Sequence, residues 1–392
     1  MNSLLAITLV AATSFAQSAA DSAATLFGRG DFPAAAAAYE AVLKAHPKDP
    51  DALLGLGTIR LYQNDLNAAE PLLDSVANAQ PQNARVQRLV GEVLRRRAEA
   101  SRRTTLDGTY TSAPFVVADP LPVVRVVANG IAADFIVDTG ADVALEPSFA
   151  QRIGVKTSNA GSGVFAGGLH APIQSGMLAS LALGGATAYD VPVHVMETHA
   201  ADLFPKLHID GIVGTTYFER FLVTIDYPGN ELILRPRTAS ASAAFQAQAS
   251  AASATIVPFY LVGDHFVFAQ AQVNAAPPGL FLFDSGLAGG GLMPTAQLVT
   301  VARLPLNQTA AGTGYGGGGA ITAVPFVAQR IAVGNAVREN VAGIFTPQGT
   351  PFALFPFVVW GAISHDFLRH YAYTVDFDAM RIVLARLPRE GR

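Results

Sequence analysis

Two short segments of this chain resemble each other, and each delivers one aspartate into a turn made of a hydroxyl residue and a glycine. The first segment reads FIVDTG (residues 135–140), and the second reads FLFDSG (residues 281–286). Two carboxyl groups about 3 Å apart cannot both ionise, so they share one proton. One of them then takes a proton from water while the other gives one to a carbonyl oxygen. Asp138 and Asp284 are therefore candidate catalytic residues for hydrolysis of a peptide bond.

The residues around the two aspartates suit such a site. Each aspartate ends an apolar run that is typical of a buried strand. Gly140 and Gly286 permit a sharp turn whose backbone N–H groups can face the carboxylates, and Thr139 and Ser285 keep a hydroxyl at each turn. The alternative is an Asx turn that ends an ordinary strand. The repetition of the whole segment favours the catalytic interpretation.

Further landmarks follow both aspartates in the same order. Gly214 closes an apolar-apolar-Gly unit 76 residues after Asp138, and Gly361 closes another 77 residues after Asp284. A short helix-like segment and a strand-turn-strand pattern then follow in each half. This order predicts an internal duplication of a β domain of roughly 130 residues.

The DTGAD motif (residues 138–142), its apolar lead-in, the apolar-apolar-Gly unit and the closing hairpin resemble the retropepsin-like and pepsin-like aspartic proteases. The resemblance covers residues 110–388 in two copies and is similar to bacterial two-lobed proteases of this kind. It implies two all-β, acid-protease-like barrels, hydroxyls of Thr139 and Ser285 that hydrogen-bond across the lobes, and no cofactor. Because the dyad titrates as a pair, neither acid nor base is assigned to one aspartate.

The second copy departs from the pattern. Leu287 stands where the family has a small residue, and the glycine run at residues 289–291 includes what reads as a one-residue insertion. Such a run could loosen the turn after Asp284. The alternative function is therefore a non-catalytic peptide-binding module that has kept the fold.

Glycine-rich segments at residues 161–168 and 312–319 are candidates for the flaps that such proteases close over a substrate. Ordinary surface hairpins are the alternative. The candidate substrate-binding residues on these segments are Val164, Phe165, Gly167, Tyr315 and Gly316.

The region before the β domains reads as helical and repetitive. Asp31 recurs as Asp65, and Pro47 recurs as Pro81, each after 34 residues. This period resembles the tetratricopeptide repeat, in which each helix pair buries its apolar face on a neighbour. The interpretations left open are a helical spacer and a groove for a protein partner. In a third candidate function, a repeat-mediated assembly protein, this domain carries the activity.

The predicted order is an all-α repeat domain followed by an all-β bilobal region. Residues 4–12 are apolar but too short to span a bilayer, and small residues follow, which predicts a signal peptide and export to the periplasm or the medium. No Lys or Arg precedes this run, and a buried N-terminal helix is the alternative. The predicted boundaries are a signal peptide at 1–20, tetratricopeptide-like repeats at 21–105, a first protease lobe at 110–236, a flexible Ala/Ser-rich linker at 237–254 and a second lobe at 255–388.

Composition excludes several other classes. The net charge of −4 leaves no basic face, so we expect no nucleic-acid partner. The chain has no cysteine, which excludes disulfides, thiolate zinc sites and cysteine nucleophiles. His194 and His199, and likewise His365 and His370, are five residues apart, a spacing that does not suit two metal ligands on one helix face. We therefore predict surface or locally bonded histidines, no metal, no later membrane span, and a peptide or protein as the substrate.

Overall fold

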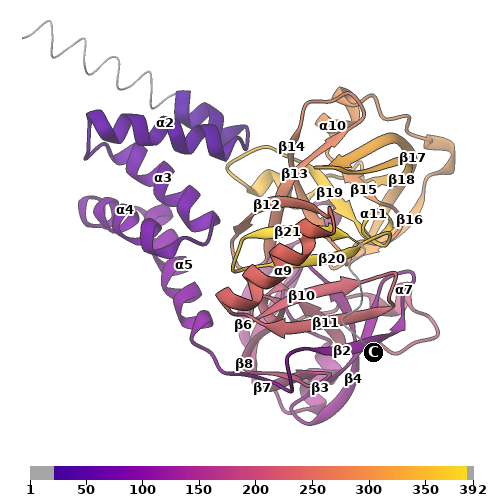
Figure 1. Cartoon of the computed structure of the whole chain (residues 1–392). Helices are drawn as coiled ribbons and strands as arrows, with labels where there is room; N and C mark the ends of the chain where they lie inside the picture. The colour runs from indigo at the N-terminus through magenta and orange to yellow at the C-terminus, as the bar shows by residue number, and fades with distance from the viewer. Residues whose placement is uncertain (1–21, 386–392) are drawn as a thin grey trace, which may run out of the picture. The chain divides into compact units, whose positions relative to one another are not determined.

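A computed structural model describes residues 22–385, so the expected signal peptide lies outside the described residues. The described chain forms two units (Figure 1). The helical unit contains the residues up to Ser101 together with Phe355–Val358, and the β unit contains Arg102–Leu354 and the chain from Val359 onward. Among residues 22–385, no helix combines the length and the apolar character that a membrane crossing needs.

The helical unit is built from antiparallel helix pairs with a recurring cap. After the helical residues 22–28, its helices are α2 (Phe32–Ala45), α3 (Pro50–Tyr62), α4 (Leu66–Ala79) and α5 (Ala84–Ala100). The carboxylates of Asp31 and Asp65 each accept a hydrogen bond from the backbone three residues on, and Asp49 and Asn83 do the same for α3 and α5. The 34-residue recurrence is therefore a recurrence of N-caps, which satisfy the free N–H groups at helix starts.

An aromatic cluster at the start of the helical unit includes a residue from far along the chain. The ring of Phe357 lies 5.1 Å from that of Phe32, 6.0 Å from that of Tyr62 and 6.3 Å from that of Phe27. The backbone N–H of Val358 donates to the carbonyl of Gly28 at 2.8 Å. The segment Phe355–Val358 thus completes the core of this unit.

The β unit contains two lobes joined by one helix. The first lobe consists of β1 (Thr104–Leu106), β2 (Thr111–Val117), β3 (Val123–Ala128), β4 (Ile131–Asp138), β5 (Ala144–Leu145), α6 (Pro147–Arg152), β6 (Ser158–Val164), β7 (His170–Leu183), β8 (Ala186–Val195), α7 (Ala200–Leu203), β9 (Gly211–Gly214), α8 (Thr215–Phe218), β10 (Phe221–Asp226) and β11 (Glu231–Pro236).

The second lobe repeats this order. Its elements are β12 (Thr255–Val262), β13 (Phe266–Val273), β14 (Gly279–Asp284), β15 (Leu292–Pro294), α10 (Ala296–Val301), β16 (Gly312–Gly316), β17 (Gly319–Val333), β18 (Ala336–Phe345), β19 (Val359–Ser364), α11 (His365–Leu368), β20 (Ala372–Asp376) and β21 (Arg381–Ala385). The predicted all-α domain followed by two acid-protease-like β lobes is confirmed.

A six-stranded antiparallel sheet joins the two lobes, in the order β2-β11-β10-β20-β21-β12. The lobes meet where β10 pairs with β20. At that seam the hydroxyls of Thr224 and Thr374 hydrogen-bond to each other at 2.7 Å, and both side chains are buried. The sheet relates the two halves of the duplication and fixes the direction in which each half presents its aspartate.

The register of the strands beside the aspartates corrects one predicted equivalence. Strand β4 runs parallel to β9 with Phe135 opposite Gly211, and β14 runs parallel to β19 with Phe281 opposite Gly361. Gly361 therefore corresponds to Gly211 and not to Gly214. A methyl group on Gly211 would lie 2.3 Å from the Ala144 oxygen, and one on Gly361 would lie 2.4 Å from the Met293 oxygen. Glycine is needed there because another backbone crosses the strand.

The Ala/Ser-rich segment between the lobes is a helix, α9 (Ala239–Ala251), and the expected flexible linker is wrong. Thr238 caps its start by accepting from the N–H of Ala241. Phe245 is buried beside strands β10 and β21, in a small apolar cluster with Leu222 and Val383. The helix has only a few apolar contacts, so its sequence lacks the pattern that would identify it.

Candidate active site

The two lobes bring Asp138 and Asp284 together. Each aspartate ends a buried strand, and their carboxyl groups are hydrogen-bonded to each other. Each also accepts a backbone hydrogen bond within its own turn, from the N–H of Gly140 at 2.7 Å and of Gly286 at 2.9 Å. The turns face each other so closely that a methyl group on Gly286 would lie 2.2 Å from Asp138 Oδ2. The two glycines therefore leave room for the opposite carboxyl group.

Both carboxyl groups hold a proton more tightly than an ordinary aspartate does. Burial raises the pKa of Asp138. Burial, followed by the negative charge of Asp138, raises the pKa of Asp284 well above its ordinary value. A pair in which one ionised group raises the pKa of the other shares a proton over a range of pH.

The hydroxyls of Thr139 and Ser285 lock the two turns to each other. Thr139 Oγ1 donates to the Phe283 carbonyl at 2.8 Å and accepts from the Ser285 N–H at 3.0 Å. Ser285 Oγ donates to the Val137 carbonyl at 3.0 Å and accepts from the Thr139 N–H at 2.9 Å. All four hydrogen bonds cross the boundary between the lobes and are buried. The cross-lobe contact that the resemblance implied is present.

The glycine run after Asp284 is held firmly. The N–H of Gly291 donates to the Ala342 carbonyl at 2.8 Å, and the hydroxyl of Ser364 donates to the Gly290 carbonyl at 2.7 Å. By strand pairing, Met293 takes the place of Ala144, so the connection after Asp284 is longer by three residues and not by one. The expected loosening is wrong, because backbone hydrogen bonds anchor the inserted residues.

The two candidate flaps are hairpins whose tips meet. One is β6–β7, with Val164 at the end of β6 and Phe165 and Gly167 in the turn. The other is β16–β17, which carries Gly316 and Tyr315, whose residue is 52% exposed. A methyl group on Gly317 would lie 2.6 Å from the ring of Phe165, so one hairpin rests directly on the other.

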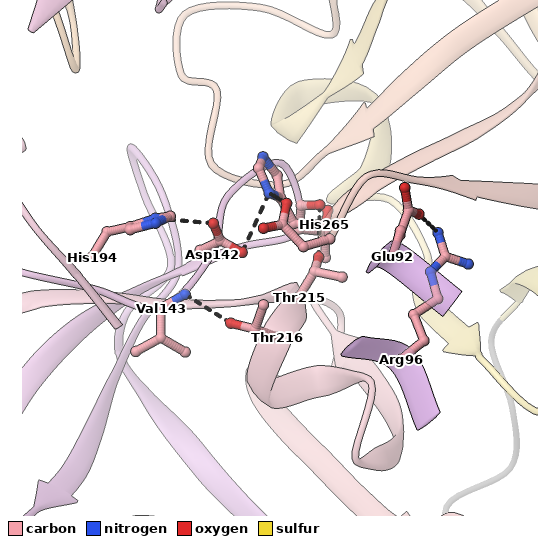
Figure 2. A network of polar contacts seen from close by, with 10 residues as sticks. Glu92, Arg96, Asp142, Val143, His194, Thr215, Thr216 and His265 are labelled. Carbon is pink, nitrogen blue, oxygen red and sulfur yellow. Dashed lines mark hydrogen bonds and ion pairs between the residues drawn. The ribbon is translucent and has the colours of Figure 1, made fainter. Parts of the chain in front are cut away.

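A buried chain of charged groups beside the dyad is not evident from the sequence (Figure 2). His194 Nδ1 lies 3.0 Å from Asp142 Oδ2, and His265 Nδ1 lies 3.3 Å from Asp142 Oδ1. His265 Nδ1 also lies 2.7 Å from Asp264 Oδ1. Asp142 is the last residue of the DTGAD motif, whereas His265 has no sequence signal because its partner belongs to the other lobe. His194, predicted to be a surface or locally bonded histidine, is one end of this chain.

The spacing of these groups is that of ion pairs. Two ligands of one tetrahedral zinc ion lie about 3.3 Å apart, given metal–ligand bonds of about 2.0 Å. The 2.7 Å between His265 and Asp264 is instead a hydrogen-bonding distance. Asp142, Asp264 and His265 form the one cluster of potential metal ligands among residues 22–385, and its members pair with one another.

Comparisons with known proteins agree with this architecture. Residues 124–217 match the family model described as "Aspartyl protease", and residues 26–93 match the one described as "Tetratricopeptide repeat". The first match contains Asp138 and ends before the second lobe. The chain thus combines a tetratricopeptide-like helical unit with an acid-protease-like β unit, as the sequence predicts.

Solved structures of proteases are among those similar to this chain. A retropepsin-like aspartic protease from Rickettsia conorii is 24% identical, with a TM-score of 0.26, over 35% of this chain and 96% of its own. An aspartic proteinase from Irpex lacteus is 12% identical, with a TM-score of 0.42, over 71% of this chain and 97% of its own. Basic 7S globulin from soybean is 10% identical, with a TM-score of 0.36, over 72% and 95%. No curated protein matches the chain.

Proposed function

We propose that this chain is an aspartic endopeptidase whose catalytic residues are Asp138 and Asp284. The observation that carries the proposal is the hydrogen-bonded pair of carboxyl groups, one from each lobe, with a raised pKa at both. Such a pair supplies an acid and a base at once. An ordinary Asx turn at the end of a strand needs no partner aspartate.

The proposed reaction uses one water and no covalent intermediate. The ionised carboxylate takes a proton from the water as its oxygen attacks the peptide carbonyl carbon, and the protonated carboxyl gives its proton to the carbonyl oxygen. The tetrahedral intermediate then returns a proton to the amide nitrogen as the C–N bond breaks. Thr139 and Ser285 position the two carboxyl groups, and the geometry they hold is what makes the transfer fast.

We expect the substrate to be an extended peptide that adds backbone hydrogen bonds beside the hairpins. Val164 and Phe165 on the first hairpin, and Gly316 with Tyr315 on the second, are the proposed contacts. Apolar residues at these positions favour substrates with apolar side chains. The helical unit is proposed to bind a protein partner, as tetratricopeptide-like repeats offer surfaces between helix pairs.

We further propose that the protein is exported, because residues 4–20 have the apolar core and small-residue end of a signal peptide. Mass spectrometry of the mature protein should find an N-terminus near residue 17 or 21. An intact Met1 on protein recovered from the cytoplasm would contradict export and would leave the proposed reaction untouched.

The full chain should cleave an unfolded protein at mildly acidic pH, within roughly the window from pH 3 to 7 that a shared-proton dyad allows. Asp138→Asn and Asp284→Asn should each abolish cleavage. Asp202→Asn is the matched control, because this carboxylate is 42% exposed and pairs only loosely with His199 at 3.7 Å. Binding of the unfolded protein without cleavage would instead indicate the non-catalytic module.

A further inference from the structure

Asp142 is rigidly connected to the turn that carries Asp138. The hydroxyl of Thr215 donates to the Thr139 carbonyl at 3.0 Å, and its N–H donates to the Ala141 carbonyl at 2.8 Å. One residue further on, the N–H of Val143 donates to Thr216 Oγ1 at 3.1 Å. A force on the side chain of Asp142 is therefore transmitted to the backbone beside the catalytic carboxyl.

The carboxylate of Asp142 is paired across the lobe boundary. Its side chain is only 9% exposed, and that of its second-lobe partner His265 is 17% exposed. His265 sits in the turn between β12 and β13, beside Asp264, while His194 approaches from β8 of the first lobe (Figure 2). A buried carboxylate is strongly unfavourable unless a cation accompanies it, so the contact needs charge on the histidines.

The charge on His265 follows from its neighbours. Burial alone would lower the pKa of His265, but the carboxylates of Asp142 and Asp264 outweigh burial and raise it to about 10. Burial alone would likewise raise the pKa of Asp142, but His265 and then His194 outweigh it and lower that pKa. The charge on His265 also acts on the dyad, since it lowers the pKa of both Asp138 and Asp284 and so opposes the effect of burial.

The second half of the duplication has no such pair. Four residues after Asp284 stands Ala288, which packs against an apolar cluster that includes Leu121 and Phe204. The dyad therefore has a charged support on one side and an apolar one on the other. This asymmetry places the whole burden of the polar link on a single histidine.

We propose that His265 is a positioning residue for the dyad: its imidazolium ties the Asp142 turn to the second lobe and places a positive charge near the shared proton. The inference rests on the proposed peptidase function, and it explains why a titratable cation lies at this boundary. The titratable groups around His265 are Asp264, Asp142, His194 and the two dyad aspartates.

The pH dependence of the link follows in sign from these groups. Because the pKa of His265 in the folded chain, about 10, is above its ordinary 6.5, the stability it contributes is complete below 6.5 and is lost as pH rises toward 10. Because the pKa of Asp142 is lowered, its contribution is present above its ordinary 3.8 and is lost at more acidic pH. The link is therefore strongest in the acidic range proposed for catalysis.

The first test measures cleavage of one peptide as kcat/KM against pH. His265→Gln should shift both limbs of the profile upward by about one pH unit, because the nearby positive charge is gone. His265→Arg, which keeps the charge, should restore the limbs toward those of the unmodified chain. His208→Gln is the matched control, because this side chain is 73% exposed and pairs with Asp210. Limbs of His265→Gln that coincide with those of the unmodified chain would overturn the proposal.

A second test needs no cleavage and so separates this inference from the proposed function. Urea unfolding of the full chain should show stability falling between pH 6.5 and 10, and Asp264→Asn should move that fall to lower pH because His265 loses one of its two carboxylates. The same fall in both proteins would overturn the proposal. If the unmodified chain unfolds as expected but never cleaves, the peptidase function fails while the charged link stands.

Discussion

Thr139 and Ser285 show how two ordinary hydroxyl residues define the site. Each hydroxyl donates to a carbonyl of the other lobe and accepts an N–H from it, so each satisfies two buried backbone groups at once. Buried polar groups without partners are strongly unfavourable. The separation of the catalytic carboxyl groups therefore depends on side chains that take no part in the proposed proton transfer.

We expect Thr139→Val to lower the free energy of unfolding by about 1–3 kcal/mol, because it leaves the Ser285 N–H and the Phe283 carbonyl without their partner. Activity should fall as well, since the turns lose their fixed spacing. Thr139→Ser is the control and should keep both properties, because the second lobe already uses serine at the equivalent position. Urea titration and a peptide cleavage assay measure the two effects; a Val variant that matches the Ser variant would contradict the role assigned to the hydroxyl.

At the scale of elements, the strands next to the aspartates were predictable and their pairing was not. The apolar runs before Asp138 and Asp284 correctly predicted β4 and β14. The equal spacings to Gly214 and Gly361 were coincidental, because a register shift in β19 and a three-residue insertion before β15 offset each other. Pairing across strands is decided by crossing backbones, which a single sequence does not reveal.

Helix α9 offers a test at this scale. Ala244 lies in its middle and is exposed, so a proline there disturbs only the helix. We expect Ala244→Pro to lower the free energy of unfolding by about 3 kcal/mol, because proline removes a hydrogen bond and clashes with the preceding turn. Ala244→Gly should cost about 1 kcal/mol. Thermal unfolding measures both, and an unchanged melting temperature in the Pro variant would restore the view of a flexible linker.

At the scale of the whole molecule, the duplication is the feature that the sequence reveals best. The repeated D-[TS]-G motif and the 34-residue helical period correctly predicted the two kinds of architecture. His265 was missed because its role depends on a carboxylate 123 residues earlier, at Asp142. The insertion of Phe357 into the helical unit was missed for the same reason. Contacts between distant segments carry no periodic signal.

The two lobes also differ in a way that exact duplication would not produce. The first carries Asp142 beside its aspartate, and the second carries Ala288. The central claim is nevertheless that both aspartates act on one water as a unit, with neither sufficient alone. Residues that work as a unit have strongly non-additive effects when replaced.

The most direct measurement is a double-mutant cycle of kcat/KM on one peptide at acidic pH, with Asp138→Asn, Asp284→Asn and the variant that combines them. We expect each single replacement to lower kcat/KM by at least about 10³-fold, and the combined variant to lose no more than either single one. Substantial cleavage by either single variant, or losses that multiply in the combined one, would contradict a shared dyad.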